Sequence, residues 1–266
     1  MLIGEKKRAI KIGNDILVVY FYGDFSVATI ALNVSNCMAE KMSDKYIKML
    51  VAMLGGTATS LEVFFLTLIF SIPLALVVAF GRMSKNRVIS GITNVFLLLI
   101  RGTPLMLQLL VVYFGPLLFV RWLSTFGFQI SFSYNRFAAA IIALSINYAA
   151  YFAEIYRGGI ESIPKGQYEA AKVLGYTPSQ TFFRIILPQV VKRIMPAMGN
   201  EVITLVKDTA LVSVIGVQEL LRVANERQSA LFSFMPLLIA GAFYFVMNWG
   251  VSFAFRCIEK KLDYYR

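Results

Sequence analysis

Residues 154–188 read EIYRGGIESIPKGQYEAAKVLGYTPSQTFFRIILP and stand between two strongly apolar segments. This stretch is too polar to cross a bilayer, and its sequence pattern is too regular for an irregular loop. Pro164 suits the first turn of a helix, where a missing N–H costs nothing, and residues 167–174 have helix-forming composition. Gly175 follows where a left-handed C-cap is required. The stretch therefore predicts a short helix that ends in a glycine turn.

A second helix is predicted directly after this turn. Residues 177–180 read TPSQ, a capping-box pattern with proline at the first helical position. Pro188 is expected to end this helix before the next apolar segment begins. Ala170 and Ala171 give the first helix a slim face, which favours docking in a groove on another protein. An ordinary loop helix is the alternative that these residues leave open.

The composition points to a membrane protein. Hydrophobic residues make up 58% of the chain and charged residues only 15%, against a usual charged share of about 25%. The net charge is +11, and most basic residues fall between apolar runs, which suits membrane topology better than a nucleic-acid stripe. The absence of histidine excludes Ser-His-Asp and Cys-His catalysis and disfavours zinc sites. Cys37 and Cys257 have neither disulfide nor metal-ligand spacing.

Five apolar segments read as membrane helices, each near the roughly 20 residues that a span needs. The second and fourth are long and interrupted by polar residues, so we expect each to tilt, kink or break. The basic residues between the spans place the 154–188 stretch and the C-terminus on the cytoplasmic side. The predicted fold class is all-α, a polytopic membrane helix bundle. The five segments are residues 57–81, 91–120, 136–157, 190–216 and 231–256.

The first 50 residues fit this arrangement less well and are treated as an N-terminal extension of uncertain structure, followed by a transmembrane domain over residues 51–266. Five spans with a cytoplasmic C-terminus place the N-terminus outside, whereas the basic residues near it favour the inside. An extra span, an interfacial segment and a later start at Met38 or Met42 all remain open. Residues 43–55 are predicted to form a short amphipathic helix on the membrane surface.

Several blocks of the sequence resemble permeases of ABC importers. The run Glu169-Ala170-Ala171, Gly175 and the run that ends at Pro188 resemble the EAA motif of that family. The run RGTPL at residues 101–105 and the run KDTAL at residues 207–211 resemble signatures of its polar amino-acid group. The resemblance covers about residues 55–260, with the blocks in the family's order. The chain is therefore similar to the membrane-spanning subunit of an amino-acid importer.

The resemblance implies a type I importer permease fold with five core spans and a cytoplasmic EAA loop over about residues 158–189. It implies two ABC ATPase subunits, a second permease subunit that is a copy or a relative, and an extracytoplasmic substrate-binding protein. The chain has no G-x-x-x-x-G-K-[ST] loop, so ATP and Mg²⁺ would bind to the ATPases and this chain needs no cofactor. The implied location is the plasma (inner) membrane of a bacterium. The coupling residues would be Glu169, Ala170, Ala171, Gly175 and Pro188.

Polar residues inside the spans are candidates for the substrate path, because ionisable groups in a bilayer are costly and often functional. Asn147 and Glu154 share one face of the third span with three alanines, a face that equally suits helix packing. Glu201 and Asp208 are seven residues apart and share a face of the fourth span, where they serve either substrate or fold. Pro104 predicts a kink in the second span. The candidates are Thr103, Gln108, Asn147, Glu154, Asn200, Glu201, Lys207 and Asp208.

The sequence thus favours a transport subunit and not an enzyme. The expected function is to form the translocation path of an ATP-driven importer, surrounded by membrane lipid and without a nucleic-acid partner. The substrate would be a polar amino acid, with basic amino acids, glutamine and cystine all open. The alternative is an ATP-independent secondary transporter or channel, for which the 154–188 stretch would be incidental. A membrane-embedded enzyme lacks an evident catalytic or metal-binding constellation.

Overall fold

A computed structural model describes the backbone of residues 6–12, 15–21, 27–126 and 135–262, and side chains from Asp44 onward within those ranges. The chain divides into two compact units, residues 1–51 and 52–266. In the first unit, β1 (Lys6–Ile12) and β2 (Asp15–Phe21) pair antiparallel. The apolar run that begins at Ile16 is therefore a hairpin strand.

The helix α1 (Val27–Arg82) begins in the first unit and continues into the second. The separate short helix predicted over residues 43–55 is wrong, because this segment lies inside α1 and no proline interrupts the helix before Pro73. Lys48 and Asp44 form an exposed ion pair one turn apart in this part of the helix. Such an exposed pair contributes about 0.3–0.5 kcal/mol to the stability of a helix.

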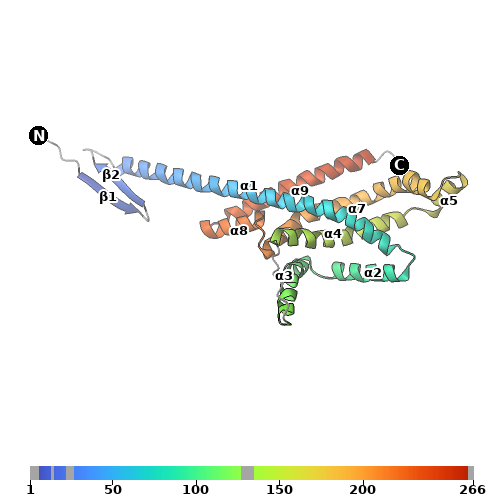
Figure 1. Cartoon of the computed structure of the whole chain (residues 1–266). Helices are drawn as coiled ribbons and strands as arrows, with labels where there is room; N and C mark the ends of the chain where they lie inside the picture. The colour runs from blue at the N-terminus through green and yellow to red at the C-terminus, as the bar shows by residue number, and fades with distance from the viewer. Residues whose placement is uncertain (1–5, 13–14, 22–26, 127–134, 263–266) are drawn as a thin grey trace. The chain divides into compact units, whose positions relative to one another are not determined.

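Every regular element that the structure describes in the second unit is helical, which confirms the predicted all-α class for this unit (Figure 1). Within the part of the chain that the structure describes, four helical segments could cross a membrane by length and composition, namely residues 44–82, 105–124, 136–161 and 235–262. The predicted span over residues 190–216 is not one of these four and stays a prediction. The helices after α1 are α2 (Arg87–Gly102), α3 (Leu105–Ser124), α4 (Arg136–Glu161), α5 (Lys165–Val173), α6 (Pro178–Gln180), the π-helix η1 (Thr181–Ile186), α7 (Leu187–Asp208), the 3-10 helix η2 (Thr209–Ile215), α8 (Leu220–Leu231) and α9 (Met235–Leu262).

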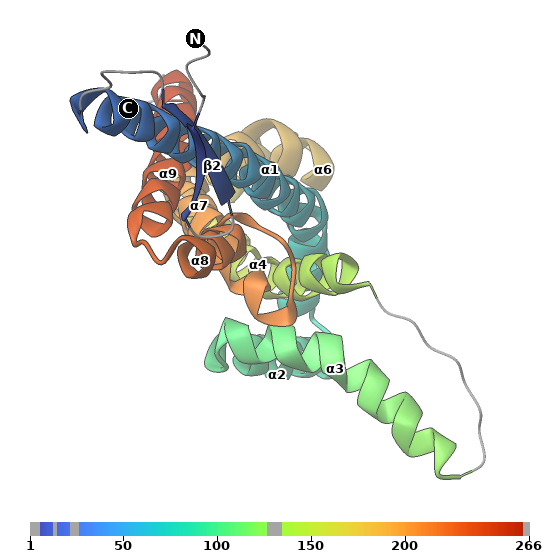
Figure 2. The ribbon, with the colours of Figure 1, turned by 90° about the vertical axis from the view of Figure 1, so that its left-hand side faces the viewer.

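The helix α4 is the centre of this unit and packs against both α3 and α7 (Figure 2). Its residues Ala139, Ala143, Asn147 and Ala150 are all buried. This confirms that the small-residue face of the third span contacts protein, where small side chains let helices approach closely. The helix α7 packs in turn against α9, and α8 packs against α9.

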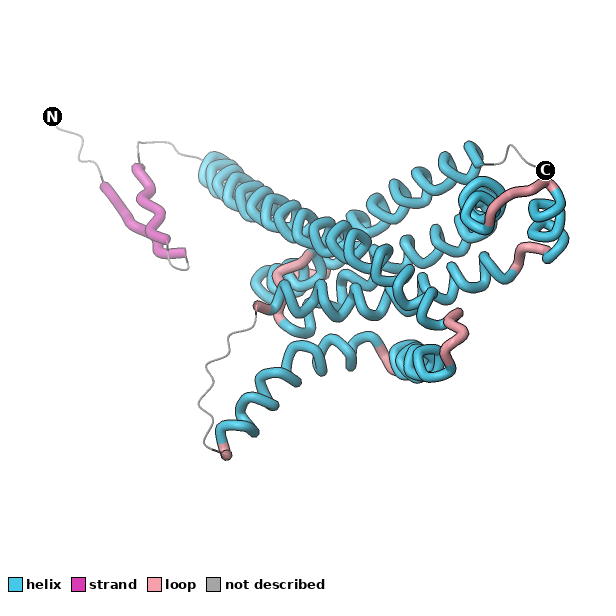
Figure 3. The backbone as a smooth tube through the Cα atoms, turned by 45° about the vertical axis from the view of Figure 1, so that its right-hand side comes forward, coloured by secondary structure: helices cyan, strands magenta, loops and turns pink. Residues whose placement is uncertain are grey.

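The second predicted span is two helices, α2 and α3, which meet at Thr103 and Pro104. The pyrrolidine ring of Pro104 disfavours a helical conformation in the residue before it. Thr103 is accordingly extended, with φ −119° and ψ 147°, and the helix axis changes direction there (Figure 3). The predicted kink is therefore a full break in the helix, which frees backbone carbonyls for side-chain hydrogen bonds.

The fourth predicted span begins as α7, and Pro196 lies inside this helix without ending it. After Asp208 the backbone tightens into the 3-10 helix η2, which ends at Gly216 with φ 89°. A Cβ atom at Gly216 would lie 2.9 Å from Nη1 of Arg136. The left-handed backbone thus favours glycine there, whereas the flexible end of the arginine side chain could move to make room for a Cβ atom.

A buried carboxylate ties three helices together at the end of the unit opposite α5 (Figure 1). Glu219 is fully buried and accepts hydrogen bonds from the Leu221 and Arg222 N–H groups, at 2.8 and 2.7 Å, which caps α8. The Tyr244 hydroxyl of α9 donates to it at 2.7 Å, and Ser60 of α1 donates at 3.5 Å. Burial raises the pKa of the Glu219 carboxyl, whereas these hydrogen bonds act in the opposite direction.

Candidate functional site

The turn after α5 has the geometry predicted for it. Gly175 has φ +78°, and its N–H donates to the Lys172 carbonyl at 3.1 Å. The Tyr176 N–H donates to the Ala171 carbonyl at 3.0 Å. This pair of bonds is the Schellman arrangement, which satisfies the last carbonyls of a helix. The α5 turn, defined here as residues 165–180, is therefore held by its own backbone without a partner.

The helix that follows starts as predicted but does not end as predicted. Thr177 and Gln180 form a reciprocal capping box with Pro178 at the first helical position. Beyond it the chain forms the π-helix η1, in which the Leu187 N–H donates to the Phe182 carbonyl. Pro188 has no N–H to donate, and its ring would meet the carbonyl four residues back in a regular α-helix. The wider π turn precedes this position, the helix continues into α7, and the predicted end at Pro188 is wrong.

The two alanines of the α5 turn face opposite environments. Ala170 is exposed together with Glu169, whereas Ala171 is 1% exposed and faces the chain itself. The interpretation of Ala171 as part of a slim outward face is therefore wrong. Its small side chain instead suits the packing of α5 against η1. Of the run Glu169-Ala170-Ala171, the first two residues are open to a partner.

Sequence reasoning missed the apolar tip of the α5 turn, which we define as Val173, Leu174 and Tyr176. Val173 and Leu174 are 87% and 73% exposed, and Tyr176 is also exposed. Single exposed apolar residues are ordinary, but neighbouring ones on a rigid turn are typical of an interaction site. The signal was present in the sequence, since Val173-Leu174-Gly175-Tyr176 places apolar residues on both sides of the glycine.

Three of the predicted path residues form one hydrogen-bonded chain where α2 breaks. The buried Gln108 amide donates to the Ile100 carbonyl at 2.7 Å and to the Thr103 hydroxyl at 2.9 Å. The Asn147 amide of α4 donates to the Gln108 side-chain carbonyl at 2.9 Å. Gln108 thus satisfies a carbonyl that the break leaves open and links it to α4. Thr103, Gln108 and Asn147 are brought together, in contacts that hold the helices.

Of the two acidic candidates on α7, Asp208 is hydrogen-bonded to α4. The Tyr148 hydroxyl, which the sequence did not single out, donates to Asp208 at 2.7 Å. Glu201 is close enough to Asp208 for the two carboxylates to interact electrostatically. The exposed Lys207 also interacts electrostatically with the Asp208 carboxylate. Asn200 is not part of this group, because it lines a separate groove between α7 and α9. The fourth-span candidates therefore divide between two faces of α7.

Glu154 is the centre of a charged cavity of about 370 Å³. Its carboxylate pairs with Arg157 at 2.9 Å, with Arg101 at 3.6 Å and with Arg82 at 4.0 Å. The Arg101 guanidinium also lies 5.6 Å from the centre of the Tyr151 ring. The three arginines and the tyrosine were not among the predicted site residues. The cavity offers one carboxylate, cationic donors and an aromatic face, a combination suited to a zwitterion. Its lining residues are Arg82, Asn94, Leu97, Leu98, Arg101, Gly102, Tyr151 and Glu154.

Comparisons with known proteins agree with this architecture. Residues 71–264 match the family model of the binding-protein-dependent transport system inner membrane component. The arginine transport system permease protein ArtQ of Bacillus subtilis is 40% identical over 211 residues, 79% of this chain and 91% of ArtQ. The L-cystine transport system permease protein TcyB of the same organism is 38% identical over 213 residues, 79% of this chain and 86% of TcyB.

A solved structure described as an amino acid ABC transporter with histidines contains a chain of similar fold. The TM-score is 0.70 at 37% sequence identity, and the match covers 81% of this chain and 96% of that one. The region that matches the family model, residues 71–264, includes α2 to α9, and with them the α5 turn and the Glu154 cavity. The chain therefore belongs to the family of binding-protein-dependent transport system inner membrane components, which are transport components and not enzymes.

Proposed function

We propose that the chain is the membrane-spanning subunit of an ATP-driven amino-acid importer. The observation that carries this proposal is the α5 turn, a hydrogen-bonded and exposed element with an apolar tip in a chain of a transport family. Relatives of similar length are named as permease proteins for arginine and cystine. An ATP-independent transporter would leave the ordered, apolar turn without a partner.

The α5 turn would dock into a cleft on an ABC ATPase. Glu169, Ala170 and the apolar tip face outward and supply the contact surface. Gly175 sets the shape of the tip, and Ala171 and Pro188 act indirectly by fixing how α5 packs on η1 and how η1 continues into α7. Closure of the ATPases would then push on α4 and α7, the helices that flank the turn. Two ATPase subunits and a second permease subunit, identical or related, would complete the assembly.

Orientation follows from the ends of the helices. The α5 turn and the last turn of α9, which carries Lys260 and Lys261, lie at one end of the second unit (Figure 1). We assign this end and the C-terminus to the cytoplasm, because basic residues are retained there. The α8 end would face the extracytoplasmic binding protein. Five spans would then be formed by α1, by α2 with α3, by α4, by α7 with η2, and by α9.

The Glu154 cavity is the proposed passage for the substrate near the cytoplasmic end of α4. An amino acid presents a carboxylate, which Arg101 can bind, and an ammonium or guanidinium group, which Glu154 can bind. The volume of the Glu154 cavity, about 370 Å³, falls within the usual range of small-molecule sites. The Thr103–Gln108–Asn147 chain and the Asp208–Tyr148 pair would hold the helices that shape the path. Basic amino acids, glutamine and cystine all fit this chemistry.

The test is a pull-down of the tagged chain from its native cell in mild detergent. The eluate is assayed for a co-purifying ATPase whose activity rises with candidate amino acids plus binding protein. We expect a stimulated ATPase, and the amino acid that stimulates it would identify the substrate. A chain that purifies alone and moves amino acids across vesicle membranes without ATP would refute the proposal.

A further inference from the structure

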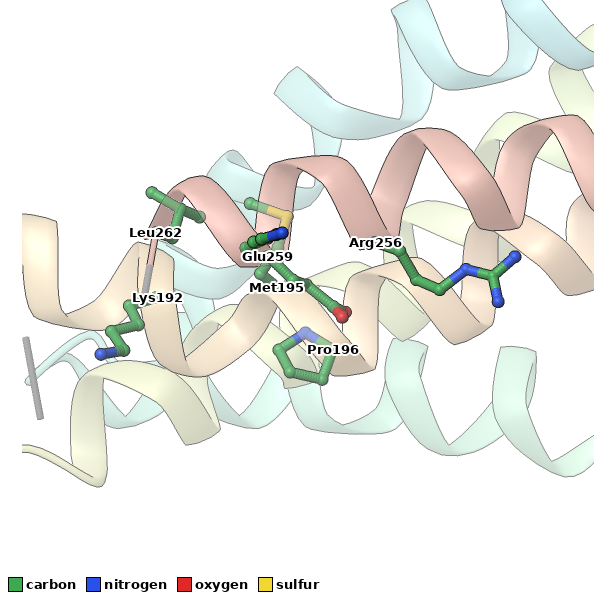
Figure 4. Close-up of a pocket in the computed structure, with 7 residues that line it drawn as sticks. Lys192, Met195, Pro196, Arg256, Glu259 and Leu262 are labelled. Atoms are coloured by element: carbon green, nitrogen blue, oxygen red, sulfur yellow. The ribbon is translucent and has the colours of Figure 1, made fainter. Parts of the chain in front are cut away.

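A groove of about 430 Å³ lies between the first turns of α7 and the last turns of α9. Figure 4 shows Lys192 of α7 and Arg256 of α9 toward its opposite ends, with Met195, Pro196 and Glu259 between them. The groove is at the same end of the second unit as the α5 turn (Figure 1). Its lining residues are Lys192, Met195, Pro196, Arg256, Glu259, Lys260 and Leu262.

The polar lining of this groove is mainly cationic. Lys192, Arg256 and Lys260 are basic and Glu259 is acidic, so most of the charged side chains that line the groove are cationic. Among the residues that the structure describes, neither Arg256 nor Lys260 forms an ion pair with an acidic side chain. Two cations held beside apolar walls favour an anionic group with an apolar body.

The groove continues along the two helices past Arg256. A second cavity of about 230 Å³ shares Pro196, Arg256 and Glu259 with the first and extends it toward Asn200 and Phe255. Asn200 is eight residues from Lys192, which is about 12 Å along a helix. The groove therefore runs from Lys192, past Arg256, to a part that Asn200 and Phe255 line side by side. A phospholipid likewise joins an anionic phosphate to an apolar acyl chain.

The helix dipole does not account for Arg256. Lys260 and Lys261 stand in the last turn of α9, where cations stabilise the helix C-terminus. Arg256 is six residues before the end of the helix, beyond the last turn in which that effect acts. It also lines both parts of the groove. From this position Arg256 can bind a separate anion in the groove.

We propose that this groove binds the head group of an anionic phospholipid, with the phosphate at Arg256 and Lys260 and an acyl chain along Phe255. The inference rests on the chain spanning a membrane and does not depend on which solute it carries. A soluble phosphate would use the same cations, but it would leave Met195, Leu262 and the extension past Asn200 without a role. The continuity of the two cavities therefore favours a lipid.

The test uses the whole complex purified through the tagged chain in mild detergent with phosphatidylcholine. Phosphatidylglycerol is titrated in, and bound lipids are counted by native mass spectrometry. The variant carries Arg256→Gln with Lys260→Gln, and the matched control carries Lys85→Gln with Lys261→Gln, two exposed cations that do not line the groove. We expect the groove variant to weaken phosphatidylglycerol binding about 25-fold, or about fivefold per charge, and the control to bind as the unaltered complex does.

Three results would overturn the proposal. Equal binding by the groove variant and the unaltered complex would mean that the groove is not the site, for instance because a second permease copy covers it. Equal losses in the groove variant and the control would indicate a general surface-charge effect. Displacement of the lipid by equimolar inorganic phosphate would assign the groove to a soluble anion. If the double variant fails to assemble, Arg256→Gln alone carries the test, with about a fivefold loss expected.

Discussion

Gly175 gives the most specific test of the α5 turn, because its role follows from one backbone angle. Its φ of +78° lies in the left-handed region, which costs other L-residues about 1–2 kcal/mol. A Cβ atom built at Gly175 meets no atom within 4 Å, so Gly175→Ala adds this conformational cost without a clash. If the α5 turn opens to relieve this strain, a smaller fraction of the molecules has the shape that docks. The affinity for the ATPase then falls by about 5–30-fold.

Gly175→Asp should have a larger effect than Gly175→Ala. It carries the same backbone strain and also places a charge beside the apolar tip, where docking would remove water from it. The measurement is the dissociation rate of the ATPase from immobilised permease, with amino-acid-stimulated ATP hydrolysis as a second readout. Gly175→Asn is expected to be milder, since asparagine tolerates the left-handed conformation.

The control for this series is Gly166→Ala, in the first turn of α5. Gly166 does not have a left-handed φ, and a Cβ atom there also meets nothing within 4 Å. We expect this variant to bind the ATPase as well as the unaltered chain, because alanine favours the helix. Wild-type coupling in both Gly175→Ala and Gly175→Asp, or an equal loss in Gly166→Ala, would refute the reasoning.

Three further predictions concern the polar groups of the second unit. Tyr148→Phe and Asp208→Asn should each lower the thermal midpoint of the purified complex, because a broken buried hydrogen bond costs about 1–3 kcal/mol. Altered selectivity at an unchanged midpoint would instead make Asp208 a substrate contact. Glu154→Gln should reduce uptake at least tenfold, about 1.4 kcal/mol, while Arg101→Lys should reduce it less because a cation remains at that position. Unchanged uptake in Glu154→Gln would exclude the Glu154 cavity from the path. Glu219→Ala should lower the midpoint through the loss of a helix cap and a buried acceptor, about 1–3 kcal/mol, and an unaltered midpoint would show that other contacts hold α8.

The local structure of the α5 turn was accessible from the sequence because it depends on neighbouring residues. Gly175 and the Thr177–Gln180 capping box act over three or four positions, and their signatures are specific. The side that Ala171 faces was not accessible, since burial depends on how α5 packs against a distant segment. The continuation through Pro188 was missed for a related reason, because a π turn has no strong local signature.

The polar path shows the same division between local and long-range information. Periodicity placed Asn147 on a protein-facing face of α4, as the structure has it. It could not pair Asn147 with Gln108, or Glu154 with Arg101, because these partners lie far apart in the chain. It also grouped Asn200 with the other polar residues of the fourth span, whereas Asn200 faces α9. A face can be read from spacing, but the helix that covers it cannot.

The most direct test of the central claim is amino-acid uptake by vesicles that contain the purified complex. Binding protein and labelled amino acid are supplied on the α8 side, and ATP is supplied on the side of the α5 turn. We expect uptake that requires both ATP and the binding protein and that is abolished by Gly175→Asp. Uptake by the chain without ATP or ATPase would contradict it and would identify a transporter that works alone.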